Sequence, residues 1–152
     1  MCYEVSRIEV PADLEDIADE LIRGATNFEV GSRLLFENER ARFWDITLAP
    51  GERLPFHCHR TSYFYRCESP GLSRVRSPDG SVATYDSHLD EVTFHEIAPG
   101  EIVIHDLTNV ADTVLRFTTV ELLDGRRASR RALDIVRAAR ARSPFAQSNR
   151  RR

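Results

Sequence analysis

The sequence contains no lysine, so all 21 of its basic residues are arginine. No physical function requires a whole chain to lack lysine, and we interpret the absence as genome composition. Cysteine is also scarce: Cys2, Cys58 and Cys67 form neither a CxxC pair nor an even set. This count argues against a disulfide framework and favours a reducing, cytoplasmic compartment.

Long apolar runs are missing as well. No run approaches the roughly 20 residues that a bilayer-spanning helix needs, and the N-terminus lacks the basic-then-apolar pattern of a signal peptide. We therefore expect a soluble protein that does not enter a membrane. At 152 residues with 41% hydrophobic content, the chain can bury one sizeable core, which predicts a single domain.

Charge is unevenly distributed along the chain, although the formal net charge is only −3. Acidic residues cluster between Glu9 and Glu20, whereas arginines crowd the segment from Arg126 to Arg152. A basic end can indicate nucleic-acid binding. Here the alanine-rich spacing and Asp134 favour a helix with a disordered tip, so we do not expect a nucleic-acid partner.

Helical spacing of apolar residues occurs near both ends. The first helix is predicted from Pro11 to Gly24, and a second begins beyond Gly125 and ends at Pro144. We expect an N-terminal strand and helix extension over residues 1–30, a barrel over residues 31–123, and a C-terminal helix with a disordered basic tail over residues 124–152. All three parts belong to one domain.

Between the helices, short segments rich in β-branched, aromatic and leucine residues alternate with turns that contain proline and glycine. The segments are Arg33–Glu37, Ala41–Leu48, Tyr63–Cys67, Leu72–Val75, Val82–Tyr85, Val92–Ile97, Glu101–Leu107 and Val114–Leu122. Ser77-Pro78-Asp79-Gly80 is the clearest hairpin turn. Short strands at near-regular intervals predict an all-β sandwich or barrel.

The stretch from Gly51 to His59 is the most informative one for function. A turn marked by proline and glycine leads into two histidines one residue apart, His57 and His59. Side chains alternate faces along a strand, so the two imidazoles point the same way, about 7 Å apart. This spacing suits one metal ion, whereas Cys58 between them should face away.

The run from Phe36 to Glu52, the histidine pair and the segment from Asn109 to Leu122 resemble small single-domain cupins of the RmlC-like jelly-roll superfamily. The resemblance covers roughly residues 27–123 and implies a double-stranded β-helix with an N-terminal and a C-terminal helix. Gly51, His57, His59 and Gly71 match the family's first motif. Its glutamate is absent, because the eligible positions hold Tyr63 and Phe64.

The family's second motif is matched by His105 and Asn109, but its approach is shortened, with no second turn between Gly100 and His105. Two alternatives follow. Either the loop is shorter and His105 keeps the metal position, or the metal histidine was lost and His105 lies elsewhere on its strand. In the second case His88 and His95, otherwise interpreted as surface or hydrogen-bonding residues, are reserve ligands.

Three imidazoles without a carboxylate would leave a divalent ion with its full charge and open positions. The resemblance to three-histidine cupins, among them thiol dioxygenases, implies a metal site at His57, His59 and His105, with Fe(II) favoured and Zn or Ni as alternatives. It also implies a dioxygenase-type oxidoreductase acting on a small polar organic acid or amino-acid-like substrate. The alternatives are a Zn- or Ni-dependent lyase, isomerase or hydrolase, and a non-catalytic ligand-binding or regulatory cupin.

Tyr63 and Arg116 are the other candidate catalytic residues. If the strand continues past His59, Tyr63 and Cys67 share the histidines' face, and Tyr63 either acts as a hydrogen-bond donor or general acid or simply packs. Arg116 differs in parity from Leu115 and Phe117, and we expect it to face inward and pair with a substrate carboxylate. A homodimer that pairs through edge strands is the expected assembly.

Overall fold

The structure is a computed structural model, and it describes residues 14–123 of the chain. Helix α1 (Leu14–Gly24) precedes the β-strands within these residues. The strands are β1 (Arg33–Glu37), β2 (Ala41–Leu48), β3 (Arg53–His59), β4 (Tyr63–Ser69), β5 (Gly71–Arg76), β6 (Val82–Ser87), β7 (Val92–His95), β8 (Val103–Asn109) and β9 (Leu115–Leu122). In this part of the chain, no helix is long and apolar enough to cross a membrane.

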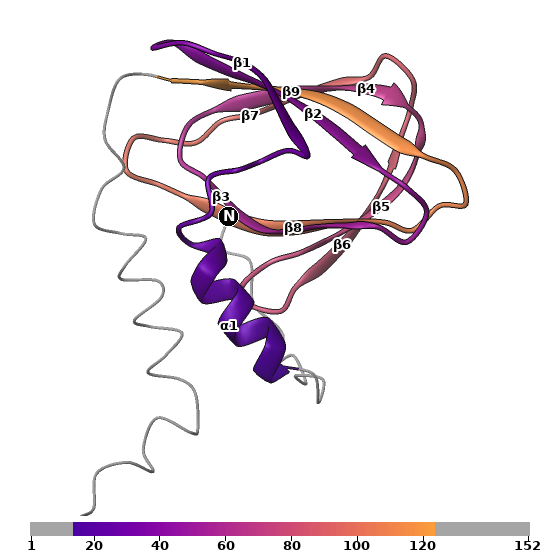
Figure 1. Cartoon of the computed structure of the whole chain (residues 1–152), viewed down its shortest axis with the longest axis horizontal. Helices are drawn as coiled ribbons and strands as arrows, with labels where there is room; N and C mark the ends of the chain where they lie inside the picture. The colour runs from indigo at the N-terminus through magenta and orange to yellow at the C-terminus, as the bar shows by residue number, and fades with distance from the viewer. Residues whose placement is uncertain (1–13, 124–152) are drawn as a thin grey trace, which may run out of the picture.

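The strands form two antiparallel sheets that lie face to face (Figure 1). The five-stranded sheet has the order β1-β2-β9-β4-β7, and the four-stranded sheet has the order β3-β8-β5-β6. Helix α1 lies beneath the four-stranded sheet, on the side away from the other layer (Figure 1). The predicted all-β jelly-roll architecture is confirmed.

Most predicted strands appear close to their expected positions, with three differences. The strand that was expected from Glu101 begins at Val103 and runs on to Asn109. β7 stops at His95, two residues early. The histidine strand ends at His59, and the chain then crosses to the other sheet before Tyr63, so one strand does not run through both. The helix expected beyond Gly125 and the basic tail lie outside the described residues.

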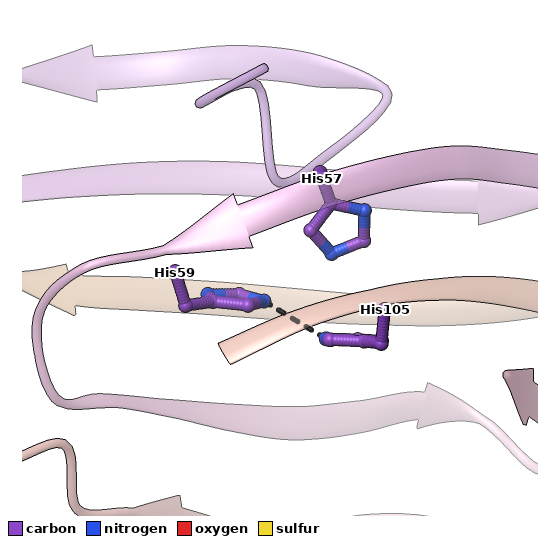
Figure 2. Close-up of side chains that lie close together, drawn as sticks. All are labelled: His57, His59 and His105. Carbon is purple, nitrogen blue, oxygen red and sulfur yellow. Dashed lines mark hydrogen bonds between the residues drawn. The ribbon is translucent and has the colours of Figure 1, made fainter. Parts of the chain in front are cut away.

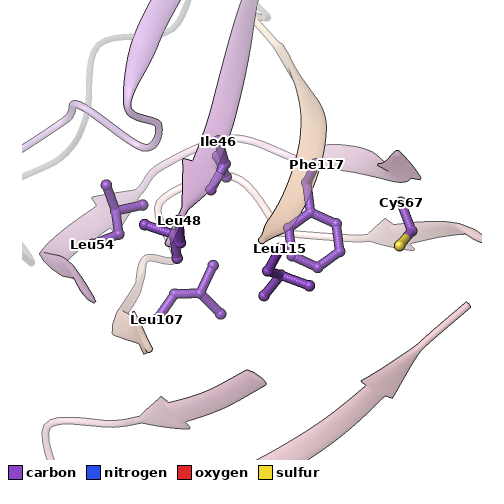
Figure 3. Close-up of a cluster of buried hydrophobic side chains, with 7 residues drawn as sticks. All are labelled: Ile46, Leu48, Leu54, Cys67, Leu107, Leu115 and Phe117. Atoms are coloured by element: carbon purple, nitrogen blue, oxygen red, sulfur yellow. The ribbon is translucent and has the colours of Figure 1, made fainter. Parts of the chain in front are cut away.

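The main core lies between the two sheets. Its buried residues come from both layers and point toward one another (Figure 3): Ile46, Leu48, Leu54, Cys67, Leu107, Leu115 and Phe117. Each fully buried aliphatic or aromatic side chain contributes about 1.5–3 kcal/mol relative to its exposed state. The core therefore holds the sheets together at one end of the barrel.

A second cluster covers the outer face of the four-stranded sheet. Ile17 and Leu21 of α1 pack against buried Phe56, Cys58 and Ile104 on β3 and β8. Helix α1 is amphipathic, and this contact buries its apolar stripe against the sheet. It also explains why Cys58 faces away from its neighbouring histidines, as predicted.

The end of α1 approaches β3 closely at Gly24. A Cβ atom added there would lie 2.7 Å from the Cβ atom of Phe56 and 3.0 Å from its carbonyl oxygen. We expect Gly24→Ala to push α1 away from β3 and to lower the free energy of unfolding by about 1–3 kcal/mol. Urea denaturation measures this loss, and an unchanged midpoint would contradict the close approach.

Candidate metal centre

A β-bulge in β3 sets up the site. In the pairing of β3 with β8, Leu54 lies opposite Leu107 and His57 lies opposite His105. Three steps along β3 therefore match two steps along β8, which places one extra residue at Pro55–Phe56. Proline suits such a position because it has no N–H to donate to the ladder. The bulge turns both Leu54 and His57 inward despite their odd spacing.

Three histidines meet on the inner face of the four-stranded sheet. His57 and His59 come from β3, and His105 comes from β8 as the register partner of His57 (Figure 2). Their ligand atoms all lie within 4.8 Å of one another, and the Nε2 atoms of His59 and His105 are 3.0 Å apart. The structure thus brings together the three residues predicted as ligands, with His105 on the inward face.

Backbone carbonyls orient two of the rings. The Nδ1–H of His57 donates to the Pro55 carbonyl at 2.8 Å, and the Nδ1–H of His105 donates to the Asp106 carbonyl at 3.0 Å. A carbonyl can only accept, so in both rings the proton is assigned to Nδ1 and Nε2 keeps its lone pair. Such outer hydrogen bonds commonly fix the tautomer of metal-binding histidines.

The donor set fits a divalent metal ion. Two nitrogens that bind one ion at about 2.0–2.1 Å lie about 3 Å apart, which matches the separation of His59 and His105. Among the described residues, no group hydrogen-bonds the buried Nδ1 atom of His59, and the Nε2 atom of this ring faces His105. His57, His59 and His105 would hold the ion through Nε2.

Burial keeps these imidazoles neutral. It lowers the pKa of His57 to about 3, with a smaller contribution from His105. Burial also holds the pKa of His59 well below its ordinary value and lowers the pKa of His105. Neutral imidazole is the form that binds metals, so the cluster is in its ligand state at neutral pH.

Charged side chains anchor the two histidine-bearing strands from the outer face. The buried Asp106 carboxylate accepts hydrogen bonds from Arg53 on β3 at 3.0 Å and from Arg76 on β5 at 2.7 Å. Arg53 also donates to Glu20 of α1 at 2.6 and 2.8 Å. Glu20 in turn accepts the N–H of Phe56 at the bulge, at 3.0 Å. The network therefore ties α1, β3, β5 and β8 together directly behind His57 and His105.

Tyr63 faces the histidines from the other sheet. Its ring stacks on His59, with centroids 3.9 Å apart, and on His95 at 4.8 Å. The interior position was predicted, but it arises because the chain crosses to β4 and not because one strand continues. Burial is the main cause that raises the pKa of the Tyr63 hydroxyl above its ordinary range, so it stays protonated and can donate a hydrogen bond.

The inward position expected for Arg116 was wrong. Leu115 and Phe117 are buried in the core, so the residue between them points outward, where its side chain is 48% exposed. Arg116 instead pairs with Asp45 on the outer face, at 2.9 Å. Its difference in parity from Leu115 and Phe117 was correctly noted, but the choice of inward face was not. The structure does not bring it to the histidines.

The remaining histidines and cysteines have simpler surroundings. His88 is exposed, and His95 is an exposed residue that stacks on Tyr63 and Tyr65. Neither joins the metal cluster among the described residues. Cys58 and Cys67 are free and buried, and burial raises the pKa of both thiols, most strongly for Cys58, to about 11. Both therefore remain protonated at neutral pH.

Glu121 is a residue of interest that sequence reasoning missed. It is 3% exposed, lies opposite Tyr63 in the register of β4 and β9, and accepts a hydrogen bond from the Trp44 indole at 2.9 Å. The signal was present, because Glu121 shares the parity of inward-facing Leu115 and Phe117.

Glu121 supports a prediction about pH. Burial raises the pKa of its carboxyl, against the opposing effects of Trp44, Arg42 and Arg60, and Glu37 raises the pKa further. A raised folded-state pKa means that stability falls as pH rises from the unfolded-state value through the folded-state value. We expect Glu121→Gln, which cannot ionise, to gain stability relative to the wild type across this window.

Trp44 is the only tryptophan in the chain, so its fluorescence reports on this carboxyl. We expect the emission to titrate above the value of about 4.3 for free glutamate, and the titration to vanish in Glu121→Gln. Glu68→Gln, on the outer face of the same sheet, serves as the control. A wild-type titration at or below the free value would contradict a raised pKa.

Solved structures of similar fold clarify the architecture. No protein-family model matches the sequence, and none of the curated proteins matches it either. A cupin domain from Bordetella pertussis Tohama I superposes with a TM-score of 0.53 at 22% identity, covering 59% of this chain and 88% of that one. This chain has the cupin fold. A double-stranded β-helix protein from Klebsiella pneumoniae is also similar, with a TM-score of 0.49 at 19% identity, covering 82% of this chain and 95% of that one.

Identities this low establish the fold of the chain and nothing about its chemistry. The predicted resemblance to cupins is confirmed at that level. The histidine cluster lies in the interior between the two sheets and is supplied by the four-stranded sheet. The chemistry of this chain is set by its own side chains.

Proposed function

We propose that this cupin binds one divalent metal ion, Fe(II) in preference to Zn or Ni, at His57, His59 and His105. We further propose that it is a dioxygenase-type oxidoreductase acting on a small polar organic acid or amino-acid-like substrate. The observation that carries the proposal is the convergence of three neutral imidazoles, two buried and one partly buried, whose ligand atoms lie within 4.8 Å of one another.

The neutral donor set favours an anionic substrate. Three imidazoles add no negative charge, so a bound ion would keep its 2+ charge and supply open positions together with redox chemistry toward dioxygen. Around these positions, the chain supplies its own groups: the Pro55 and Asp106 carbonyls hold the rings, and protonated Tyr63, whose ring stacks on His59, would donate a hydrogen bond to a bound substrate. Buried surroundings also strengthen any charge interaction with the substrate.

Two measurements test this proposal. Elemental analysis of the purified full-length chain distinguishes iron from zinc, from nickel and from no metal. Oxygen consumption with a panel of thiols, amino acids and 2-oxo acids then tests the dioxygenase activity. Iron with substrate-dependent oxygen uptake is expected. Zinc or nickel without oxygen uptake would favour the lyase, isomerase or hydrolase alternative, and no metal at all would favour a non-catalytic ligand-binding cupin.

We also propose that the chain forms a homodimer, through the outer face of the five-stranded sheet instead of the edge strands expected from the sequence. One apolar residue from each strand of the five-stranded sheet lies in the same register row on its outer face: Phe36, Phe43, Val120, Phe64 and Phe94. Phe36 and Phe94 are 53% and 57% exposed, and no described element covers the row. Five strands about 4.8 Å apart and about 20 Å long present roughly 480 Å² in projection, of the same order as the ~800 Å² that each partner in a stable complex buries.

Light scattering tests the dimer. We expect a mass of about two chains for the wild type and of one chain for Phe94→Glu, because a charge at this position would be buried without a partner. Leu89→Glu, an exposed apolar residue in the loop before β7, is the matched control and should remain dimeric. A monomeric wild type would contradict this part of the proposal.

A further inference from the structure

Near the metal centre, the five-stranded sheet turns polar residues toward the interior and apolar residues toward the outside. One register row crosses all five strands of the five-stranded sheet, and its members are polar: His95, Tyr63, Glu121, Arg42 and Glu37. Its central members, Tyr63 and Glu121, are buried between the sheets. The adjacent row, one residue along each strand, faces outward and is apolar. Sheets ordinarily bury the apolar row, so the polar one requires a separate explanation.

The polar row reaches the metal centre through Tyr63. Its ring is stacked on His59, and Glu121 lies directly opposite Tyr63 on the next strand. Facing residues on neighbouring strands have Cβ atoms about 5 Å apart. Glu121 is therefore a neighbour of the residue whose ring covers His59, without being one of the metal-binding group.

Arg42 lies between two carboxylates of this row and makes its close contact with Glu37, not with Glu121. Arg42 binds Glu37 at 2.8 Å, whereas its guanidinium is 4.0 Å from Glu121. Arg60, the other cation near Glu121, is held over the Phe28 ring at 3.5 Å. The hydrogen bond that Glu121 accepts comes from the neutral Trp44 indole. A buried carboxylate in this setting favours a cationic hydrogen-bond donor as an additional partner.

We propose that Glu121 binds the ammonium group of a substrate whose anionic end occupies the metal at His57, His59 and His105. The ligand class is then a small amino acid or a similar zwitterion, and not a plain organic acid. This inference rests on the proposed function and narrows its substrate class. In this arrangement the substrate lies along Tyr63, whose ring stacks on His59 and which lies opposite Glu121.

The inference is tested by comparing two probes that differ only in the amine, 3-aminopropanoate and propanoate. The full-length chain is loaded with Co(II), and both affinities are measured by titration calorimetry. A charge-assisted hydrogen bond corresponds to a preference of about 10–100-fold for the amine-bearing probe in the wild type. Glu121→Gln should reduce the preference to about twofold or less while it still binds Co(II).

Two further variants keep the test decisive. Arg42 is partly exposed and is the cation nearest to Glu121. Arg42→Gln removes this competing charge and should increase the preference for the amine-bearing probe. Glu68→Gln, on the outer face, should leave it unchanged. A wild type that does not prefer the amine, or a preference that survives in Glu121→Gln, would overturn the ammonium site. A chain that takes up no Co(II) would instead overturn the proposed function, and the ammonium site with it.

Discussion

The double substitution His57→Ala His59→Ala is expected to abolish stabilisation by metal ions. An ion that binds only the folded state at 100 times its dissociation constant adds about 2.7 kcal/mol to the free energy of unfolding. For a chain of this size, that corresponds to a rise in Tm of about 5–10 °C. The variant lacks two of the three converging imidazoles, so its Tm should not respond to metal. Differential scanning fluorimetry with and without Fe(II) under anaerobic conditions measures the difference.

His95→Ala is the matched control, since His95 stacks on Tyr63 but lies outside the metal cluster. Its metal-dependent rise in Tm should equal that of the wild type. An equal rise in the double variant would show that the ion binds elsewhere and would contradict the site. Without metal, both variants should unfold cooperatively, which urea denaturation can confirm.

The second large effect is expected for Asp106→Ala. The Asp106 carboxylate is fully buried and accepts hydrogen bonds from the side chains of Arg53 and Arg76 and from the backbone N–H of Arg76 at 2.8 Å. Its removal leaves two guanidinium groups and an amide without this partner. Breaking a buried charge network in this way costs about 3–5 kcal/mol, which urea denaturation should detect as a large fall in the unfolding midpoint.

Metal affinity should fall together with stability in Asp106→Ala. The Asp106 carbonyl orients His105, and the carboxylate network fixes the backbone at that point. Asp90→Asn, in the turn before β7, removes the charge of the exposed pair with Arg66, suits the positive φ of this position and should cost about 1 kcal/mol or less. A loss in Asp106→Ala no larger than in Asp90→Asn would contradict the anchoring role of the network.

The fold was largely predictable because its signals are local. Turns with proline and glycine separate short apolar segments, and alternation along a strand places His57 and His59 on one face. Helix α1 was predicted from its apolar spacing and its terminal glycine. None of these inferences depends on knowing which strands are neighbours.

The rest of the site depended on pairings between distant strands. Whether His105 joins His57 is decided by the bulge at Pro55, which shifts the register of β3 against β8 by one residue. No local pattern reveals such a shift, so the two alternatives for His105 could not be separated from the sequence. On β9, the wrong face was expected to point inward, so Arg116 was placed inside the barrel and Glu121 was overlooked. Both errors have one cause: parity divides a strand into two faces without showing which one is buried.

The central claim is that His57, His59 and His105 bind one metal ion together. X-ray absorption spectroscopy of the full-length chain loaded with Zn tests it most directly, because imidazole ligands give a distinct multiple-scattering pattern. We predict three imidazole nitrogens at about 2.0–2.1 Å, and two when His105→Ala is measured. A spectrum with no imidazole ligands, or one that His105→Ala leaves unchanged, would contradict the account.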